Sequence, residues 1–243
     1  MSDPLFLLDP LPAGVVVVLD GPEGRHAATV RRIGVGERIM LADGRGRRRR
    51  GEVVDVGREM LHVRCEPIET VPEPHRRVVA VQALAKGERG DLAVELLTEL
   101  GVDEIVPWTA ARSIVQWRGE RADRSLRRWR RTAQEAGKQS RRARFPVVTG
   151  AAGTGAVAER IATAGAAIVL HERAGAPLVD AVLGDSGEVI VVIGPEGGIT
   201  DDELSAFEAA GATTVRLGDT VLRTSTAGGA ALAALSGRLG RWQ

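Results

Sequence analysis

The sequence predicts an α/β protein in which a small β-barrel precedes a larger domain with a mainly parallel sheet. Up to residue 73, short apolar runs alternate with turn signals, and after it apolar runs alternate with helical patterns. Short, regularly spaced strands are typical of small barrels, whereas alternating strands and helices are typical of parallel sheets. Two prolines in Val71–His75 mark the change of pattern and predict a linker. We therefore expect domains at 1–73 and 74–243.

The first domain is predicted to contain four strands and one short helix. The strands are expected at 15–19, 38–42, 51–56 and 61–65, and the helix at 24–32. Asp43-Gly44 predicts a hairpin, because this dipeptide favours the left-handed conformations of tight turns. Four consecutive arginines, Arg47, Arg48, Arg49 and Arg50, follow it. They have two interpretations, which remain open here: protection of an edge strand against aggregation, or contact with phosphates.

The second domain is predicted to alternate strands with helices from residue 78 onwards. Strands are expected at 78–84, 104–108, 166–170, 188–193 and 214–217, and helices at 91–100, 123–139, 158–163, 200–210 and 226–239. Thr200 and Glu203 have the spacing of a capping box. Short apolar runs that end in glycine-rich turns predict buried parallel strands that bring their loops to one edge of the sheet.

Composition indicates a globular protein of a reducing compartment. The net charge is +1, and the single cysteine, Cys65, excludes an internal disulfide. No apolar run is long enough to cross a bilayer, and the N-terminal residues do not resemble a secretory signal, so we expect a cytoplasmic location. Residues 118–144 carry eleven basic and three acidic side chains. This excess predicts a phosphate-backbone contact, although a solvated helix in an arginine-rich composition gives the same pattern.

Two glycine-rich loops in the last third of the chain are the candidate ligand site. The first, Gly194–Thr200, contains Glu196 and leads into Asp201, Asp202 and Glu203, acids that would repel a pyrophosphate at a helix N-terminus. A second glycine run, at 150–155, lacks the spacing of a dinucleotide fingerprint. The four histidines, at 26, 62, 75 and 171, are scattered without metal-ligand spacing, and no nucleophile elbow occurs. A ligand without phosphate and with a cationic tail, such as S-adenosylmethionine, is compatible with these loops.

The amino-acid sequences of several segments resemble the motifs of one protein family. Gly194-Pro-Glu-Gly-Gly, Leu217-Gly and Val221-Leu-Arg-Thr-x-Thr-Ala227 resemble the SPOUT class of knotted methyltransferases. Within that class the chain is similar to the ribosomal small subunit methyltransferase E family, which methylates N3 of a uridine in 16S ribosomal RNA. Further matches are Glu95–Gly101, Glu135–Arg142 and the Asp43-Gly44 pair. Ser225 departs from the pattern, since the family commonly has glutamate there.

The resemblance implies a PUA-like RNA-binding barrel at 1–73, a trefoil-knotted α/β methyltransferase domain at 74–243, and a homodimer. It also implies that S-adenosylmethionine binds in the knot and that no metal is used. The expected cofactor-binding residues are Leu170, His171, Glu172, Ile193, Gly194, Pro195, Glu196, Gly197, Gly198, Leu217, Gly218, Val221, Leu222, Arg223, Thr224, Thr226 and Ala227.

The partner implied is ribosomal RNA, within the small ribosomal subunit. The residues expected to contact it are Arg25, Arg31, Arg32, Arg47, Arg48, Arg49, Arg50, Arg112, Glu135, Gln139 and Arg142. Arg223 is the candidate for stabilising charge during the reaction, and Glu196 for a base or an anchor of the methionine amine. Two alternatives remain: methylation of another RNA atom, such as a ribose 2′-hydroxyl, or a non-catalytic RNA-binding assembly factor.

Overall fold

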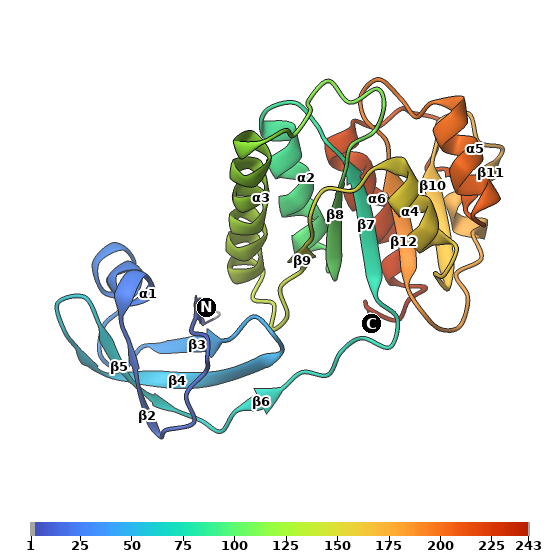
Figure 1. The fold of residues 1–243 in the computed structure, drawn as a ribbon. Coiled ribbons are helices and arrows are strands. Elements are labelled where there is room, and N and C mark those ends of the chain that lie inside the picture. The colour runs from blue at the N-terminus through green and yellow to red at the C-terminus, as the bar shows by residue number, and fades with distance from the viewer. Residues whose placement is uncertain (1–2, 243) are drawn as a thin grey trace. The chain divides into compact units, whose positions relative to one another are not determined.

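The computed structural model describes residues 3–242 and consists of two compact units (Figure 1). The first comprises the described residues up to Glu73 together with Gly137–Phe145, and the second comprises the remainder. The predicted boundary at residue 73 placed 137–145 in the second domain, because this segment lies between other residues of that domain in the chain. Its tertiary contacts instead lie with the first unit, where, for example, Lys138 Nζ donates to Glu23 Oε1 at 2.7 Å.

The first unit is built around a curled, mostly antiparallel sheet. Its strands run in the order β1-β3-β4-β5-β2, and β6 also pairs with β4. Their bounds are β1 Leu5–Leu7, β2 Val16–Leu19, β3 Arg38–Ala42, β4 Arg47–Val56, β5 Leu61–Cys65 and β6 Glu69–Thr70. The predicted helix at 24–32 begins earlier, as α1 Gly21–Arg25, and continues as a π-helical segment, His26–Val30. Pro22 in the first turn explains the early start, since its fixed φ suits that position.

The predicted hairpin at Asp43-Gly44 joins β3 and β4. The Asp43 carboxylate accepts hydrogen bonds from the backbone N–H groups of Arg45 and Arg47 at 2.7 and 3.0 Å. Gly44 and Gly46 have φ values of +71° and +108°, which L side chains rarely adopt. The turn therefore depends on this acid and these glycines.

The edge-strand interpretation of Arg47–Arg50 is wrong. Strand β4 is an interior strand, with Arg48 opposite Ala42 of β3 on one side and Glu69 of β6 on the other. It is the hydrogen-bonding partners of the strand, rather than the charges along it, that decide whether an edge is exposed. These arginines therefore protect no open edge.

The second unit contains a seven-stranded sheet whose pairings are all parallel, in the order β11-β13-β10-β12-β7-β8-β9. The strands are β7 Val78–Ala83, β8 Glu104–Trp108, β9 Val147–Val148, β10 Ala166–Leu170, β11 Ala176–Pro177, β12 Val189–Ile193 and β13 Thr213–Arg216. The predicted fold class is confirmed: a curled N-terminal sheet precedes an α/β domain with a parallel sheet. Strands β1, β6, β9 and β11 were not predicted, because two or three residues are too few to establish a pattern.

Helices cover both faces of this sheet (Figure 1). They are α2 Glu88–Glu99, α3 Glu120–Gln139, α4 Thr154–Ile161, α5 Asp201–Ala209 and α6 Thr224–Ser236, with a 3-10 turn at Leu178–Asp180. One core cluster joins the sheet to α2, α3 and α6, and the other joins it to α4 and α5. Trp129, Ala133 and Ala136 of α3 are buried. The strands carry apolar side chains on both faces because both faces are covered.

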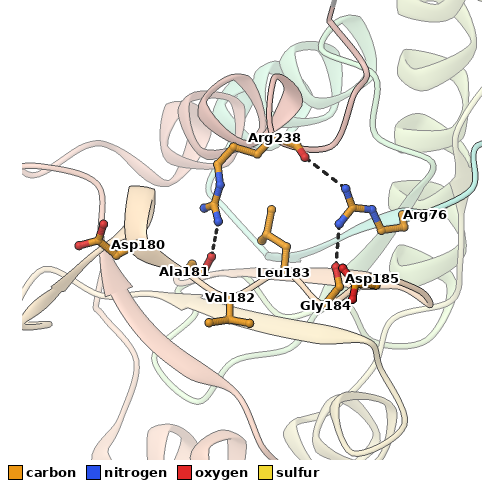
Figure 2. A pocket seen from close by; sticks show the side chains of 8 residues that line it. All are labelled: Arg76, Asp180, Ala181, Val182, Leu183, Gly184, Asp185 and Arg238. Atoms are coloured by element: carbon orange, nitrogen blue, oxygen red, sulfur yellow. Dashed lines mark hydrogen bonds between the residues drawn. The ribbon is translucent and has the colours of Figure 1, made fainter.

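A hollow of about 500 Å³ lies at the edge of this sheet where the strands begin (Figure 2). Arg76 and Arg238 reach across it to backbone carbonyls: Arg76 donates to Gly184 at 2.8 Å and Arg238 to Ala181 at 2.6 Å. These guanidinium groups thus hold the loop that leads into β12. The hollow lies at the opposite edge from the glycine-rich loops that follow β12 and β13.

An ionic cluster ties the same edge of the sheet to α4. The buried Glu104 pairs with Arg77 at 3.0 Å and with Arg160, and both arginines also pair with Glu188. Burial acts to raise the pKa of Glu104, but the hydrogen bonds and charges of Arg160 and Arg77 outweigh it, so the pKa lies below the usual value of 4.5. The ionised carboxylate therefore stabilises the folded state.

We predict that Glu104→Gln lowers the free energy of unfolding by about 2 kcal/mol at pH 7. The depressed pKa makes this contribution complete above the unfolded-state pKa. It is lost as pH falls through the folded-state value, so the difference from wild type shrinks below about pH 4. Urea unfolding from pH 7 to pH 3 measures both quantities. A difference that grows with acidity would contradict the assignment.

Candidate functional site

Three loops meet at the edge of the sheet where the parallel strands end, and we call them the loop cluster. They are Leu170–Glu172 after β10, Gly194–Gly198 after β12 and Leu217–Arg223 after β13. Because β10 pairs with both β12 and β13, the loops leave neighbouring strands on the same side. The structure thus brings together the segments that sequence analysis selected for a ligand. Open parallel sheets bind ligands at this edge.

Close packing shapes the Gly194–Gly198 turn. A Cβ at Gly194 would lie 2.8 Å from Ile199 Cγ1, so a side chain there would displace the buried isoleucine. Gly198 has a φ of +77° and donates its N–H to the Pro195 carbonyl at 2.9 Å. Both glycines are therefore required by the geometry of the turn.

A hydroxyl connects two of the loops through the interior. Thr224, the first residue of α6, is buried, and its Oγ1 donates to the Gly194 carbonyl at 2.7 Å. The same Oγ1 accepts from Nε2 of Gln82, a fully buried residue of β7, at 3.1 Å. Since the amide occupies the oxygen as a donor, the hydroxyl hydrogen is directed to Gly194. This chain of hydrogen bonds holds the start of α6 against the ends of β12 and β7.

The loop after β13 leaves its backbone available. No backbone hydrogen bond is found for residues 218–222, all of which the structure describes. Val221 and Leu222 are 75% and 39% exposed, and Gly218 has open space where a Cβ would stand. Exposed apolar side chains beside unpaired N–H and C=O groups suit a flat, partly apolar ligand held by the main chain. An adenosine moiety has this character.

The charged side chains around the turn differ in their partners. Glu196, whose side chain is 20% exposed, pairs with Arg89 of α2 at 3.4 Å. Arg223 is exposed and has no hydrogen-bond or ion-pair partner for its guanidinium among residues 3–242. The acid is thus partly compensated, whereas this arginine is free to meet a negative charge.

Arg112, on the loop after β8, approaches the same turn. A Cβ at Gly197 would lie 2.9 Å from the Arg112 carbonyl oxygen, and Arg112 Nη1 lies 3.9 Å from the Cβ position of Gly198. The absence of a side chain at Gly197 therefore allows the two loops to touch. Arg112 joins the loop cluster as an exposed cation at its border.

The predicted RNA-contacting residues of the first unit differ in their availability. Arg49 is buried, and its guanidinium donates to the carbonyls of Glu66, Pro12 and Gly14. The prediction that Arg49 contacts RNA is therefore wrong: its side chain holds the barrel together. Arg48 pairs with Glu69 at 2.9 Å.

The remaining basic residues of that prediction are solvent-accessible. Arg25, Arg31, Arg32, Arg47 and Arg50 are exposed. Arg25 forms an ion pair with Glu59 and Arg50 forms one with Asp3, but both arginine side chains remain more than half exposed. Gln139 and Arg142 belong to the segment of the first unit at 137–145, whereas Glu135 belongs to the second unit.

Sequence reasoning missed two residues of the site, Gln82 and Arg89. Gln82 is the only polar side chain of β7, and a lone polar residue in a fully buried strand is a signal that could have selected it. Arg89 carries no comparable signal, because an arginine in the first turn of a helix is usually a solvated side chain. Only the approach of Glu196 reveals its role.

No group of His, Cys, Asp or Glu side chains within residues 3–242 is arranged to hold a metal ion. Over the same residues, none of the helices has the length and apolar character that crossing a membrane requires.

Comparison with known proteins identifies the family. Residues 72–236 match the RNA methyltransferase domain family, and residues 19–64 match the RNA methyltransferase PUA domain family. A protein from Mycobacterium bovis, ribosomal RNA small subunit methyltransferase E, is 49% identical over 98% of this chain and 93% of its own length. The chain belongs to the ribosomal RNA small subunit methyltransferase E family.

Other members of the methyltransferase E family agree in sequence and in structure. The Bacillus subtilis member is 28% identical over 90% of this chain and 88% of its own length. The crystal structure of the Neisseria gonorrhoeae member, bound to S-adenosyl methionine, superposes with a TM-score of 0.87 at 28% identity and covers 98% of both chains.

We predict that Thr224→Val destabilises the protein by about 1–3 kcal/mol, because it leaves the buried Gly194 carbonyl without its donor and removes one of the acceptors of the Gln82 amide. Thr224→Ser, which keeps the hydroxyl, is the matched control and stays close to wild type. Chemical unfolding measures both variants. Equal stability of Thr224→Val and wild type would show that water replaces the hydroxyl at no cost.

Proposed function

We propose that this protein transfers a methyl group from S-adenosylmethionine to N3 of a uridine in 16S ribosomal RNA, on the assembled small subunit. The observation that carries the proposal is the loop cluster itself: within residues 3–242, the backbone of 218–222 makes no backbone hydrogen bond, and the adjacent Arg223 guanidinium has no hydrogen-bond or ion-pair partner. Membership of the methyltransferase E family supports the chemistry. The S-adenosyl methionine bound to the Neisseria gonorrhoeae member supports the cofactor.

The residues of the loop cluster fit this cofactor. We assign its binding to the residues expected from the sequence in the three loops and the first turn of α6. The open backbone of 218–222 and the side chains of Val221 and Leu222 would receive the adenosine. The Glu196 carboxylate, which pairs with Arg89, would anchor the methionine amine through a charge-assisted hydrogen bond.

When bound, the cofactor supplies an electrophilic methyl group on a sulfonium. Before N3 could take up the methyl group, its proton would have to pass to solvent water, which would leave negative charge on the uracil ring. Arg223 would stabilise that charge, since a preorganised cation acts most strongly where charge appears in the transition state. Fixed positions of the two reactants would supply much of the remaining acceleration.

The first unit would hold the RNA through its exposed arginines: Arg25, Arg31, Arg32, Arg47 and Arg50. Because aromatic residues make up only 3% of the chain and tyrosine does not occur, few rings can stack on bases, and phosphate contacts would dominate. Arg112, Glu135, Gln139 and Arg142 would complete the contact, from the same or a partner subunit. The PUA-domain match over residues 19–64 supports this assignment.

We further propose a trefoil knot, a homodimer and a cytoplasmic location. The knot is supported by the path of the chain, which leaves β13 and returns past β10 to β12 and β7, where α6 begins. The homodimer rests on the family resemblance alone. Buried, unpaired Cys65 suits the reducing cytoplasm.

The decisive experiment is methyl transfer from labelled S-adenosylmethionine to purified, unmethylated small ribosomal subunits, with mass spectrometry of the nucleosides. We expect 3-methyluridine. Another methylated nucleoside would support S-adenosylmethionine as the cofactor but would contradict uridine N3 as the target atom. Absence of both transfer and cofactor binding by calorimetry would favour the RNA-binding assembly factor.

Arg223→Ala is predicted to lower kcat in this assay by about 10²-fold, the range seen when one charge-stabilising donor is removed. Arg223→Lys should recover part of the loss, since it restores charge without the planar fork. The Kd for S-adenosylmethionine, measured by calorimetry, separates a binding role from a catalytic one. An unchanged kcat would remove Arg223 from the mechanism.

Arg47→Ser together with Arg50→Ser should weaken RNA binding and reduce the salt dependence of log K. Each lost phosphate contact lowers the slope by about 0.7–0.9. Arg31→Ser tests the helical side of the same unit in the same way. Filter binding from 50 to 200 mM salt, roughly the range over which phosphate contacts lose strength, is the measurement. An unchanged slope would exclude these arginines from the RNA contact.

A further inference from the structure

The carboxylate of Glu203 makes more contacts than a helix cap requires. Its Oε2 accepts from the N–H and the hydroxyl of Thr200, which with the return bond to Oγ1 completes the capping box of α5. Its Oε1 accepts from the Ala111 N–H at 2.8 Å and from the Thr154 hydroxyl at 3.1 Å. The cap accounts for one oxygen, and the other joins two distant segments to α5.

The environment of this carboxylate indicates a fixed junction. Glu203 is 5% exposed, and all four of its donors are uncharged. Thr154 in turn accepts from Trp108 Nε1 at 3.2 Å, and Trp108 packs edge-on against Phe207 of α5. A buried anion is retained only where hydrogen bonds compensate its desolvation. These bonds fix the end of β8, the start of α4 and the start of α5 to one another.

The Ala111 N–H is the point at which this junction reaches the loop cluster. The next residue, Arg112, packs its carbonyl onto Gly197 and brings Nη1 near Gly198. Arg112 is exposed, and no hydrogen bond or ion pair of its guanidinium is found within residues 3–242. The backbone on either side of it is held at two points: the Ala111 N–H donates to Glu203, and the Ser113 N–H donates to the Ala110 carbonyl at 3.0 Å. The bond to Glu203 is the one that ties this turn to α5.

We propose that Glu203 is a positioning residue: its Oε1, through the Ala111 N–H, holds Arg112 against the Gly194–Gly198 turn so that its guanidinium meets the RNA substrate beside the reacting methyl group. The inference rests on the proposed function, in which Arg112 contacts RNA. A displacement of about 1 Å at a substrate-positioning group costs on the order of 10²-fold in rate. A capping role alone would leave the Arg112 loop unaffected.

Glu203→Gln tests the proposal, because an amide cannot accept from four donors and must lose bonds at one oxygen. Thr200→Ala is the matched control: it weakens the same cap and leaves the bond from Ala111 to Oε1. We expect Glu203→Gln to lower kcat about tenfold and Thr200→Ala less than twofold at similar loss of stability. Equal kcat values for the two variants would overturn the proposal.

A double-mutant cycle with Arg112→Ala identifies the route of the effect. If Glu203 acts through Arg112, Glu203→Gln lowers kcat little further once Arg112 is removed. Multiplication of the two losses, or no loss of kcat or RNA affinity in Arg112→Ala, would overturn the proposal. The kcat values of the cycle are measured for whichever nucleoside the wild-type protein methylates. The result therefore does not depend on whether uridine N3 is the target atom.

Limited trypsin digestion supplies a readout that is independent of methylation. Cleavage after Arg112 should be about tenfold faster in Glu203→Gln than in wild type, and unchanged in Thr200→Ala, because only the first releases this loop. An unchanged cleavage rate in Glu203→Gln would overturn the positioning role even if the protein methylates no RNA. Absence of methylation with faster cleavage would overturn the proposed function and keep Glu203 as the restraint on Arg112.

Discussion

The hydrogen bond from Thr224 to the Gly194 carbonyl is the constraint on which the loop cluster depends. It joins the end of β12 to the start of α6, two points that are in contact although they lie 30 residues apart in the chain. Gln82 directs the hydroxyl by donating to its oxygen. Because these groups are buried, an unmade bond would carry the full cost of desolvation. The bond therefore fixes the end of β12 against the start of α6 before a ligand binds.

Acidic and basic side chains lie in different parts of the loop cluster, and this separation decides which charge of ligand each part can accept. Glu196 and the acidic first turn of α5 disfavour phosphate at the turn, whereas a sulfonium and an amine are compatible with them. Arg223 and Arg112, at the border of the loop cluster, have no ion-pair partner in the part of the chain that the structure describes, so they are available to a polyanion. Glu203, buried between these regions, contributes geometry: its charge is satisfied by neutral donors. In the proposed function, one edge of the sheet thus offers separate surfaces to a cationic cofactor and an anionic substrate.

Local patterns predicted most elements of the fold and failed where elements were too short or their ends depended on packing. The five longer strands of the second unit were found because both faces of the sheet are covered, which makes them continuously apolar. The two-residue strands β9 and β11 were missed. The four arginines at 47–50 are identical in sequence but differ in environment, since Arg49 is buried against the carbonyls of Pro12, Gly14 and Glu66, whereas Arg47 and Arg50 are exposed. Segment 137–145 was assigned by chain order, which does not report tertiary contacts.

The sequence by itself determined the α/β class, the order of most elements, the capping box at Thr200 and the loop residues that identify the family. These features are local, because propensity, period and turn chemistry are encoded within a few residues. Tertiary structure alone decided that Gln82 orients Thr224, that Arg89 pairs with Glu196, and that Glu203 reaches Ala111. Each of these contacts joins segments far apart in the chain, and no local pattern specifies which buried polar group will meet which partner.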